Sequence, residues 1–431
     1  STIAAFSKSA EVLIASRALL GLAGATVAPS TLSLIRNMFL DPRQRTAAIG
    51  VWITSYSIGD AIGPLLGGLV LQYFWWGAVF LLAVPVMVLV LVLGPVLLPE
   101  YRDPNAGRPD LISAALSLAA VLAVIFGLKQ IAQDGLSLLP ALSILGGLAL
   151  GVVFVRRQHQ LADPLIDLRL FRIPAFSASL ATYGLSILVV FGGFLFLPQY
   201  LQLVLGLSPL QSGLWTLPWA LAFIVGSNLT PLIVRRVRPG FVMAAGLVLT
   251  AVGFAMFTQV DATSGLAVFV IGSVIFSLGL SPVFTLTTDL IVGSAPPERA
   301  GAASAISETG AEFGGALGIA IFGSIGIAVY RRVLAHDIPA GVPPEAAASA
   351  RETLAGALVV AERLPAQLGS ALADAARGAF IAGLQLSVGI SAILALGLAI
   401  FVAVMLRRMR MGSEPDRAAE VLPEQQSQPA P

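Results

Sequence analysis

The sequence predicts an all-α polytopic membrane protein, and three observations support this fold class. Hydrophobic residues make up 57% of the 431 positions and charged residues only 11%, whereas soluble domains carry about 25% charged residues. Apolar runs of about 20 residues, enough to cross a bilayer as a helix, recur along the chain. Arginine clusters fall in every second connection between these runs. Together these patterns predict helices that pass back and forth through a membrane.

The apolar runs define eleven complete membrane spans. They cover residues 12–38, 47–70, 75–98, 110–132, 137–155, 175–205, 211–234, 240–260, 265–292, 300–330 and 378–406. The first residues, STIAAFSKS, resemble the end of a helix that is already under way. We therefore expect further helices to precede this sequence in the native protein.

The placement of arginine predicts the orientation of the spans. Four connections, 71–76, 133–137, 206–210 and 260–264, contain no Lys or Arg. The connections that alternate with them, and the tail, carry Arg43, Arg45, Arg102, Arg108, Arg156, Arg157, Arg169, Arg172, Arg235, Arg236, Arg238, Arg299, Arg407, Arg408 and Arg410. Because loops rich in Lys and Arg stay in the cytoplasm, we expect a multi-pass protein of the inner, cytoplasmic membrane with a cytoplasmic C-terminus.

Two segments outside the spans are distinctive. Residues 331–377 form a long outer connection, in which Ala346–Leu364 and Ala366–Ala379 predict two short amphipathic helices separated by Pro365. This connection is either a solvated cap, or a gate or partner-binding element, since loops of this length are often functional. Residues 412–431 are rich in Glu, Gln and Pro, which predicts a disordered tail.

Two acidic residues, Glu308 and Glu312, lie inside the tenth span. Their i,i+4 spacing places them on one helix face, beside Ser304 and Gly315. A charge at the bilayer centre costs about 2.5–3.5 kcal/mol on insertion scales, and like charges one turn apart favour protonation of one of them. We predict a proton-exchanging carboxylate site that faces an internal cavity. The alternative is a structural buried pair whose charges are satisfied by neighbouring groups.

The second span contains the string GDAIGPLLGG. Its small residues and proline are Gly59, Gly63, Pro64, Gly67 and Gly68. Small residues at four-residue spacing let helix backbones approach closely, and proline kinks a helix. The string therefore predicts a conformational element, and ordinary small-residue helix packing is the alternative.

This string resembles the antiporter motif in the fifth helix of drug:proton antiporters of the major facilitator superfamily. Upstream, LIASRALLGLAGA (Leu13–Ala25) is similar to the fourth-helix pattern of that family, with Arg17 and Gly21 at its arginine and glycine positions. Phe196–Pro218 resembles the ninth-to-tenth helix junction of the fourteen-helix branch, and Ala295–Gly318 its thirteenth helix. Relatives in this branch, among them quaternary-ammonium and methyl-viologen efflux pumps, also carry two acids at i,i+4 there.

The resemblance implies a major facilitator fold with eleven complete helices of an inferred fourteen, the N-terminal helices being missing. It divides the chain into residues 1–98, the remainder of the N-terminal half bundle; 99–160, two intervening helices; 161–411, the C-terminal half bundle with the outer loop; and 412–431, the tail. The first-helix acid, the basic loop motif between helices two and three, and the first two helices themselves are absent from this sequence.

The function implied is proton-coupled efflux of lipophilic, cationic drugs or antibiotics by alternating access. Export of a neutral or anionic metabolite is one alternative, and a non-transporting truncated fragment is another. The resemblance also gives Arg17 a role, the facilitation of proton transfer at a nearby carboxylate. Arg17 lies near the outer end of its span, so extension of its side chain to the membrane interface is the alternative.

Asp60 departs from the family pattern, which has a small or apolar residue at this position of the motif. Trp52, Tyr56 and Asp60 share one helix face, which forms either an extra cation-binding edge or, through Asp60, a pair with Arg17. Asp289 lies near the inner end of the ninth span, where an interfacial role is expected. The span 211–234 has no acid, which favours monovalent lipophilic cations.

Aromatic residues in the C-terminal half are candidates to line a cavity, in which cation–π contacts would suit a flat lipophilic cation. They are Tyr183, Phe191, Phe194, Phe196, Trp215 and Trp219. Lipid-facing or core packing is the alternative for each of them.

Other classes of protein lack support in the sequence. Cysteine is absent and the two histidines lie outside the apolar runs, which excludes disulfides and disfavours a metal site. We find no phosphate-binding loop, dinucleotide fingerprint or nucleophile elbow, so neither catalysis nor ATP hydrolysis is expected. The expected partners are the lipid bilayer, small-molecule drugs and protons, without nucleic acid. A monomer that uses the proton gradient and no cofactor is expected.

Overall fold

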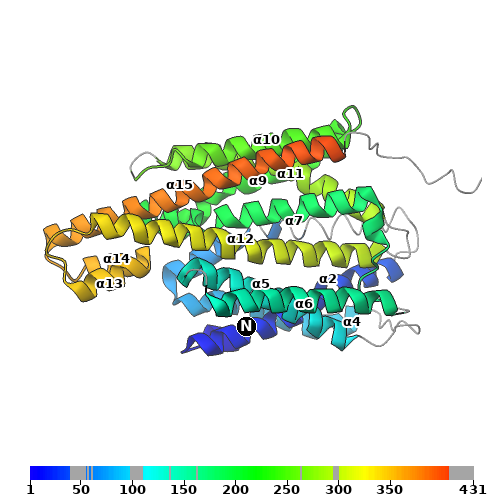
Figure 1. The fold of residues 1–431 in the computed structure, drawn as a ribbon, viewed down its shortest axis with the longest axis horizontal. Coiled ribbons are helices and arrows are strands. Elements are labelled where there is room, and N and C mark those ends of the chain that lie inside the picture. Colours follow the sequence, from blue (N-terminus) through cyan, green and yellow to red (C-terminus); the bar gives the residue numbers. More distant parts are fainter. Residues whose placement is uncertain are drawn as a thin grey trace, which may run out of the picture.

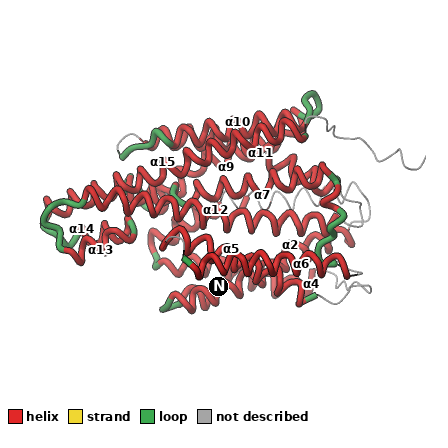
Figure 2. Tube along the Cα trace, in the orientation of Figure 1, coloured by secondary structure: helices red, strands yellow, loops and turns green. Residues whose placement is uncertain are grey.

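The structure is a computed structural model that describes residues 1–38, 55, 58–59, 62–97, 110–134, 137–161, 164–262, 265–294 and 300–406. Within these ranges all regular secondary structure is helical, as Figure 2 shows. Three candidate site residues, Trp52, Tyr56 and Asp60, lie outside the described residues, and so does the tail 412–431. The predictions for them stay predictions.

The helices follow one another in the order α1 Thr2–Ala5, α2 Ala10–Met38, a helix at Ile62–Tyr73, the 3₁₀ helix η1 Trp76–Leu82, α4 Ala83–Leu97, α5 Leu111–Asp134, α6 Leu138–Gln160, η2 Leu170–Arg172, α7 Pro174–Phe194, α8 Leu197–Gln199, the π-helix η3 Tyr200–Val204, α9 Pro209–Ile233, α10 Pro239–Phe257, α11 Gly265–Gly293, α12 Ala300–Asp337, α13 Pro344–Glu352, α14 Leu354–Ala361 and α15 Ala366–Met405.

Nine segments of the described chain are helical, long and apolar enough to cross a membrane. They coincide one by one with the predicted spans from 75–98 to 378–406, which confirms the polytopic fold class. The first predicted span, 12–38, corresponds to helix α2. The second, 47–70, is described mainly from Ile62 onward.

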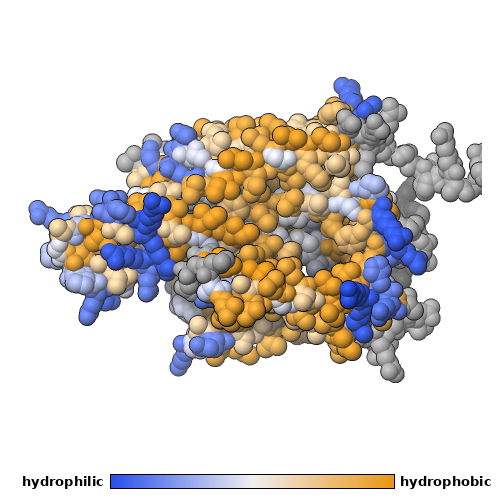
Figure 3. Space-filling view, viewed as in Figure 1, coloured by the Kyte–Doolittle hydropathy of each residue, from blue (hydrophilic) through white to orange (hydrophobic). Residues whose placement is uncertain are grey.

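The long helices run side by side along the long axis of the molecule (Figure 1). Helix α10 packs on α11 and α15, α7 packs on α12, and α9 packs on α11. These six helices form the C-terminal bundle. The hairpin of α5 and α6 joins this bundle through contacts of α5 with α12. Apolar residues cover the middle of the molecule and hydrophilic residues gather at its two ends (Figure 3), as a bilayer requires.

Close packing of α7 on α12 depends on glycine. A Cβ atom at Gly314 would collide with the carbonyl oxygen of Gly184, and one at Gly318 with that of Leu188. Such small-residue contacts let two membrane helices approach at backbone distance. Glu312 lies two residues before Gly314, so at 100° per residue it projects about 160° around α12 from this contact. Glu308 stands in the same relation to Gly310.

The predicted span 175–205 is not one continuous helix. Helix α7 ends at Phe194, and the chain continues through α8 and the π-helix η3. Pro198 explains the break, because it has no N–H to donate and its ring clashes with the carbonyl four residues earlier, at Phe194. The hydroxyl of the fully buried Tyr200 donates to the carbonyl of Asp261 at 2.6 Å, which anchors η3 to the α10–α11 connection.

The long connection between α12 and α15 differs from the prediction. Ala346–Leu364 is not one helix, because Thr353 adopts an extended conformation and caps α14 by accepting a hydrogen bond from Gly356 N–H at 3.0 Å. Ala366–Ala379 is not a separate helix either, since α15 runs unbroken from Ala366 to Met405. No helix-breaking residue separates the two predicted elements. We call residues 338–365, which contain α13 and α14, the elbow.

The elbow is folded and packed on the C-terminal bundle at one end of the molecule (Figure 1). The buried Tyr330 hydroxyl of α12 donates to the Ala350 carbonyl of α13 at 2.7 Å. Leu354 of α14 belongs to the same hydrophobic cluster as Leu372 of α15. Beyond the elbow, Arg377 Nε of α15 donates to the Leu203 carbonyl of η3 at 3.3 Å. These contacts fix the elbow to the C-terminal bundle.

Candidate functional site

The acid pair on α12 is the first part of the candidate site. The side chains of Glu308 and Glu312 are both exposed in the structure. Neither carboxylate makes a hydrogen bond or ion pair with any residue that the structure describes. The half-buried Tyr183 of α7 lies close enough for the charges of both carboxylates to act on its hydroxyl. The pair is therefore available to a proton or to a cation.

A series of half-buried aromatic rings begins beside the acid pair and passes through α7, α11 and α9. The ring centres of Tyr183 and Phe284 are 5.3 Å apart, and those of Phe284 and Phe223 are 6.1 Å apart. Phe223 and Trp219 follow at 6.5 Å, and Trp219 and Phe194 at 5.2 Å. Three of the predicted cavity aromatics, Tyr183, Phe194 and Trp219, thus belong to one continuous series. The sequence gave no signal for Phe223 and Phe284, which lie among many apolar neighbours.

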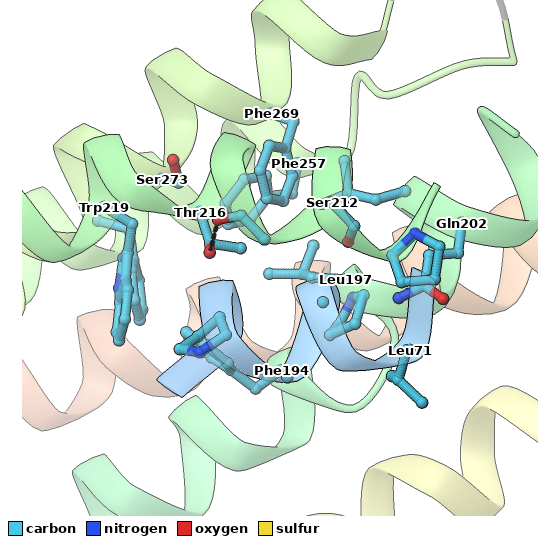
Figure 4. Close-up of a pocket in the computed structure, with 18 residues that line it drawn as sticks. Leu71, Phe194, Leu197, Gln202, Ser212, Thr216, Trp219, Phe257, Phe269 and Ser273 are labelled. Atoms are coloured by element: carbon cyan, nitrogen blue, oxygen red, sulfur yellow. Dashed lines mark hydrogen bonds between the residues drawn. The ribbon is translucent and has the colours of Figure 1, made fainter. Parts of the chain in front are cut away.

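The far end of this series opens into a cavity of about 320 Å³, which we call the seam cavity (Figure 4). It lies between the helix Ile62–Tyr73 and the C-terminal bundle. Its lining consists of Pro64, Gly67, Gly68, Leu71, Phe194, Leu197, Pro198, Leu201, Gln202, Pro209, Ser212, Gly213, Thr216, Trp219, Phe257, Phe269, Ser273 and Phe276. None of these residues carries a charge. Trp215, in contrast, is 39% exposed and does not line the cavity.

The glycine–proline helix meets the start of α9 beside this cavity. A Cβ atom at Gly68 would lie 2.5 Å from the Pro209 carbonyl oxygen, and one at Gly213 would lie 2.6 Å from the Pro64 carbonyl oxygen. The two helices therefore touch at backbone distance, and neither site admits a side chain. By contrast, Cβ atoms at Gly63 and Gly67 would meet no atom within 4 Å.

The structure separates the remaining candidates from the acid pair and from the seam cavity. Gly59 and Gly21 have open space around them, so nothing in the described residues requires glycine there. The exposed Arg17 of α2 places its guanidinium carbon 5.6 Å from the centre of the Phe80 ring of η1, a cation–π contact. Asp289 is exposed, one turn before the end of α11.

A polar cluster at one end of the α5–α6 hairpin was not predicted. Arg157 forms an ion pair with Asp110 at 3.1 Å and donates from Nε to the Ser113 hydroxyl at 3.2 Å. The buried Gln158 donates to the same hydroxyl at 2.7 Å and accepts from the backbone N–H of Ile166 at 3.2 Å. The spacing of Asp110 and Ser113, an acid before a helix and a polar residue three positions later, was the available signal.

The electrostatics of this cluster favour the ionised form of Asp110. The Ser113 hydroxyl and the Ser113 backbone N–H donate to its two oxygens, and Arg157 adds a third hydrogen bond. In that order these groups lower the pKa of Asp110 to about 2. The cluster joins the α5–α6 hairpin to the segment that leads into α7, and it fixes the intervening helices to the C-terminal half.

Comparisons with known proteins agree with this architecture. A model of the Major Facilitator Superfamily matches residues 1–319. The multidrug efflux pump LfrA of Mycolicibacterium smegmatis is 43% identical over 408 residues, which cover 95% of this chain and 81% of LfrA. The methyl viologen resistance protein SmvA of Salmonella typhimurium is 34% identical over 388 residues, which cover 88% of this chain and 77% of SmvA.

A solved structure shares the fold. It is that of a bacterial homolog of the human lysosomal transporter Spinster, in an inward-facing and unoccupied conformation. The TM-score is 0.56 at 16% sequence identity, over 94% of this chain and 80% of that one. The family match, the identity to LfrA and the arrangement of helices confirm the resemblance found in the sequence: the chain belongs to the major facilitator superfamily.

Proposed function

We propose that this protein exports lipophilic, positively charged drugs or antibiotics across the cytoplasmic membrane in exchange for protons, by alternating access. The observation that carries the proposal is the acid pair on α12, unpaired within the described chain and placed beside a series of aromatic rings. The relatives support the class of cargo, since LfrA is a multidrug efflux pump and SmvA confers resistance to methyl viologen, an organic cation.

Exchange follows from the electrostatics of the pair. Two carboxylates one helical turn apart repel each other, and either a proton or a cation relieves that repulsion. Because both ligands neutralise the same charge, each weakens the binding of the other, and this reciprocal effect is the coupling free energy of the exchange. Tyr183 adds a ring against which a flat cation can stack, so the site combines charge with an aromatic surface.

The change of access is assigned to the contact between the glycine–proline helix and α9. Backbone contact at Gly68 and Gly213 holds the two halves together at the end of the molecule that carries the elbow. The distribution of arginine places this end outside the cell and the C-terminus in the cytoplasm. Separation of the halves here would open the site outward, as rigid-body rocking of transporter halves requires.

The proposal requires no bound cofactor and no catalytic step, and the proton gradient supplies the energy. A monomer contains both halves of the site, so no second copy is needed. The second candidate function is export of an uncharged metabolite, and one observation favours it. The seam cavity, at the far end of the aromatic series from the acid pair, has no charged residue in its lining.

Reconstituted protein tests the proposal and separates the two candidates. Proteoliposomes with an imposed pH gradient are expected to accumulate rhodamine 6G, a flat monovalent cation, and collapse of the gradient should stop accumulation. The double variant Glu308→Gln, Glu312→Gln should lose gradient-driven uptake. Glu345→Gln, which removes an acid on the elbow, is the matched control and should transport normally.

Two outcomes contradict the proposal. One is gradient-driven uptake at the full rate in the double glutamine variant. The other is competition for uptake by neutral and anionic aromatic compounds that is as strong as competition by cations. That second result would favour the metabolite exporter.

A further inference from the structure

We propose that the seam cavity is a second ligand site, which binds a flat, uncharged aromatic compound independently of the acid pair. The proposal further states that occupation of the cavity slows export by holding the two halves together. The binding claim stands apart from the proposed function, and only its effect on export rests on that function.

The walls of the cavity suit an aromatic ligand. Its volume of about 320 Å³ lies at the lower end of the range for small-molecule pockets, about 300–1,000 Å³. Five aromatic side chains from α7, α9, α10 and α11 contribute to the lining: Phe194, Trp219, Phe257, Phe269 and Phe276. Rings prefer offset or edge-to-face contacts with other rings, and such pairs add about 0.5–1.5 kcal/mol beyond burial. Figure 4 shows Phe194 and Trp219 toward one end of the cavity.

The polar groups of the lining favour an uncharged ligand. The Thr216 hydroxyl donates to the Gly213 carbonyl at 2.7 Å, and the Ser273 hydroxyl donates to the Val270 carbonyl at 2.8 Å. These hydroxyl hydrogens are thus used within their own helices. An ion in the cavity would lose its hydration without a counter-charge, which is strongly unfavourable. Gln202, at the opposite end of the view from Trp219 (Figure 4), offers a carboxamide to a carbonyl or hydroxyl group of the ligand.

The cavity is bounded by both halves of the molecule. Pro64, Gly68 and Leu71 of the helix Ile62–Tyr73 form one wall, and Pro209 and Gly213 of α9 lie in the wall that meets it. The backbone contacts of Gly68 and Gly213 therefore border the same space. A ligand that touches both walls binds the closed seam more tightly than an open one. By linkage, it shifts the protein toward the state in which the seam is closed.

Neither Glu308 nor Glu312 lines the cavity. The aromatic series connects the two places, yet the charge resides at one end and the apolar space at the other. A neutral compound should therefore bind without the carboxylates. A cation with the same ring system should depend on them. This difference separates the seam cavity from the acid pair by experiment.

The test uses the whole protein in lipid nanodiscs with two probes, neutral pyrene and the permanent cation pyrenylmethyl-trimethylammonium. Binding is measured by energy transfer from tryptophan to pyrene, with empty nanodiscs as the baseline for pyrene dissolved in lipid. Trp219→Phe identifies the part of the signal that arises at the cavity. Two separate cavity-filling variants, Thr216→Phe and Ser273→Phe, place a ring in the lining.

The control is Leu221→Phe, a comparable increase in side-chain size on the same helix as Thr216. Leu221 is 59% exposed and does not line the cavity. Pyrene affinity should fall at least tenfold in the cavity-filling variants and remain within twofold of the native value in Leu221→Phe. It should also remain within twofold in the double variant Glu308→Gln, Glu312→Gln. Helix content from circular dichroism establishes that each variant is folded.

Native pyrene affinity in both folded cavity-filling variants would overturn the proposal, and so would loss of pyrene binding in the double glutamine variant. In proteoliposomes, pyrene should slow uptake of the cationic probe by the native protein and not by the cavity-filling variants. If no variant transports any cation while pyrene still binds at the cavity, the proposed function fails and the second site stands.

Discussion

A methyl group added at Gly213 would lie 2.6 Å from the carbonyl oxygen of Pro64, in the helix on the other side of the seam. The contact between these two residues joins the N-terminal half to the C-terminal half at one end of the molecule. It ties the glycine–proline motif to a physical role, since a side chain at this point must push the two helices apart. The first prediction follows from it.

Gly68→Ala or Gly213→Ala should shift the protein toward a conformation with an open seam. Overpacking of this kind costs about 1–3 kcal/mol in the closed state. Because the chain has no cysteine, a single Ser212→Cys residue reports access to the seam cavity. A membrane-impermeant maleimide added outside should label it severalfold faster in either alanine variant. Gly63→Ala, where a Cβ meets no atom within 4 Å, is the control, and equal labelling rates in all three variants would disprove the assignment.

Tyr183 should contribute to cargo affinity through its ring. Tyr183→Leu removes the aromatic surface beside the acid pair, and we expect about a tenfold loss of affinity for a flat cation, about 1.4 kcal/mol. Tyr183→Phe keeps the ring that contacts Phe284 and should retain most of the affinity. Equilibrium binding of rhodamine 6G to the purified protein measures both. Equal affinities of the leucine and phenylalanine variants would remove the ring from the site.

The ion pair of Asp110 and Arg157 should stabilise the α5–α6 hairpin over the whole physiological pH range. The pKa of Asp110 is lowered to about 2 from its ordinary value of 3.8. A carboxylate with a depressed pKa stabilises the fold above its ordinary value, and this contribution is lost as the pH falls toward 2. Asp110→Asn should therefore lower the melting temperature by the same amount at pH 6 and pH 8.

Asp374→Asn is the control for this prediction. Asp374 pairs with Arg377 at 3.3 Å, but its side chain is 76% exposed, and exposed pairs contribute little. Its melting temperature should stay near that of the native protein. A destabilisation of Asp110→Asn that disappears between pH 8 and pH 6 would contradict the assigned origin of the effect.

The elbow should behave as a cap rather than as a gate. Tyr330→Phe removes the hydrogen bond to Ala350, and we expect it to lower the free energy of unfolding by about 1 kcal/mol. The rate of transport should not change, because the elbow stays packed on the C-terminal bundle. Tyr73→Phe, at a tyrosine 73% exposed, is the matched control. A Tyr330→Phe protein with native stability and altered transport would instead support the gate.

Hydropathy predicted the helices well because the bilayer sets their length. Nine predicted spans match helices of the structure to within a few residues at most boundaries, and the family assignment from the glycine–proline motif was confirmed. The break after Phe194 was missed, since the apolar run continues through Pro198 and hydropathy does not register the lost hydrogen bond. The elbow was misassigned at Thr353, where a single capping residue divides an otherwise helical stretch.

The sites that depend on three-dimensional contact could not be predicted from the sequence. The seam cavity is lined from segments that are more than 200 positions apart, Pro64 and Phe276 among them, and no local pattern relates them. The cluster around Asp110 was overlooked because its partners lie on both helices of a hairpin. Glu308 and Glu312 were recognisable because an acid within a membrane span is unusual wherever it occurs.

The release of protons on cargo binding tests the central claim most directly. Purified protein in weakly buffered solution at pH 6 is titrated with rhodamine 6G while a pH indicator records the protons set free. We predict that protons are released in proportion to the cation bound and that the double variant Glu308→Gln, Glu312→Gln releases none. Saturation of the native protein with the cation, without release of protons at any pH between 5 and 8, would contradict the exchange of cargo for protons at the acid pair.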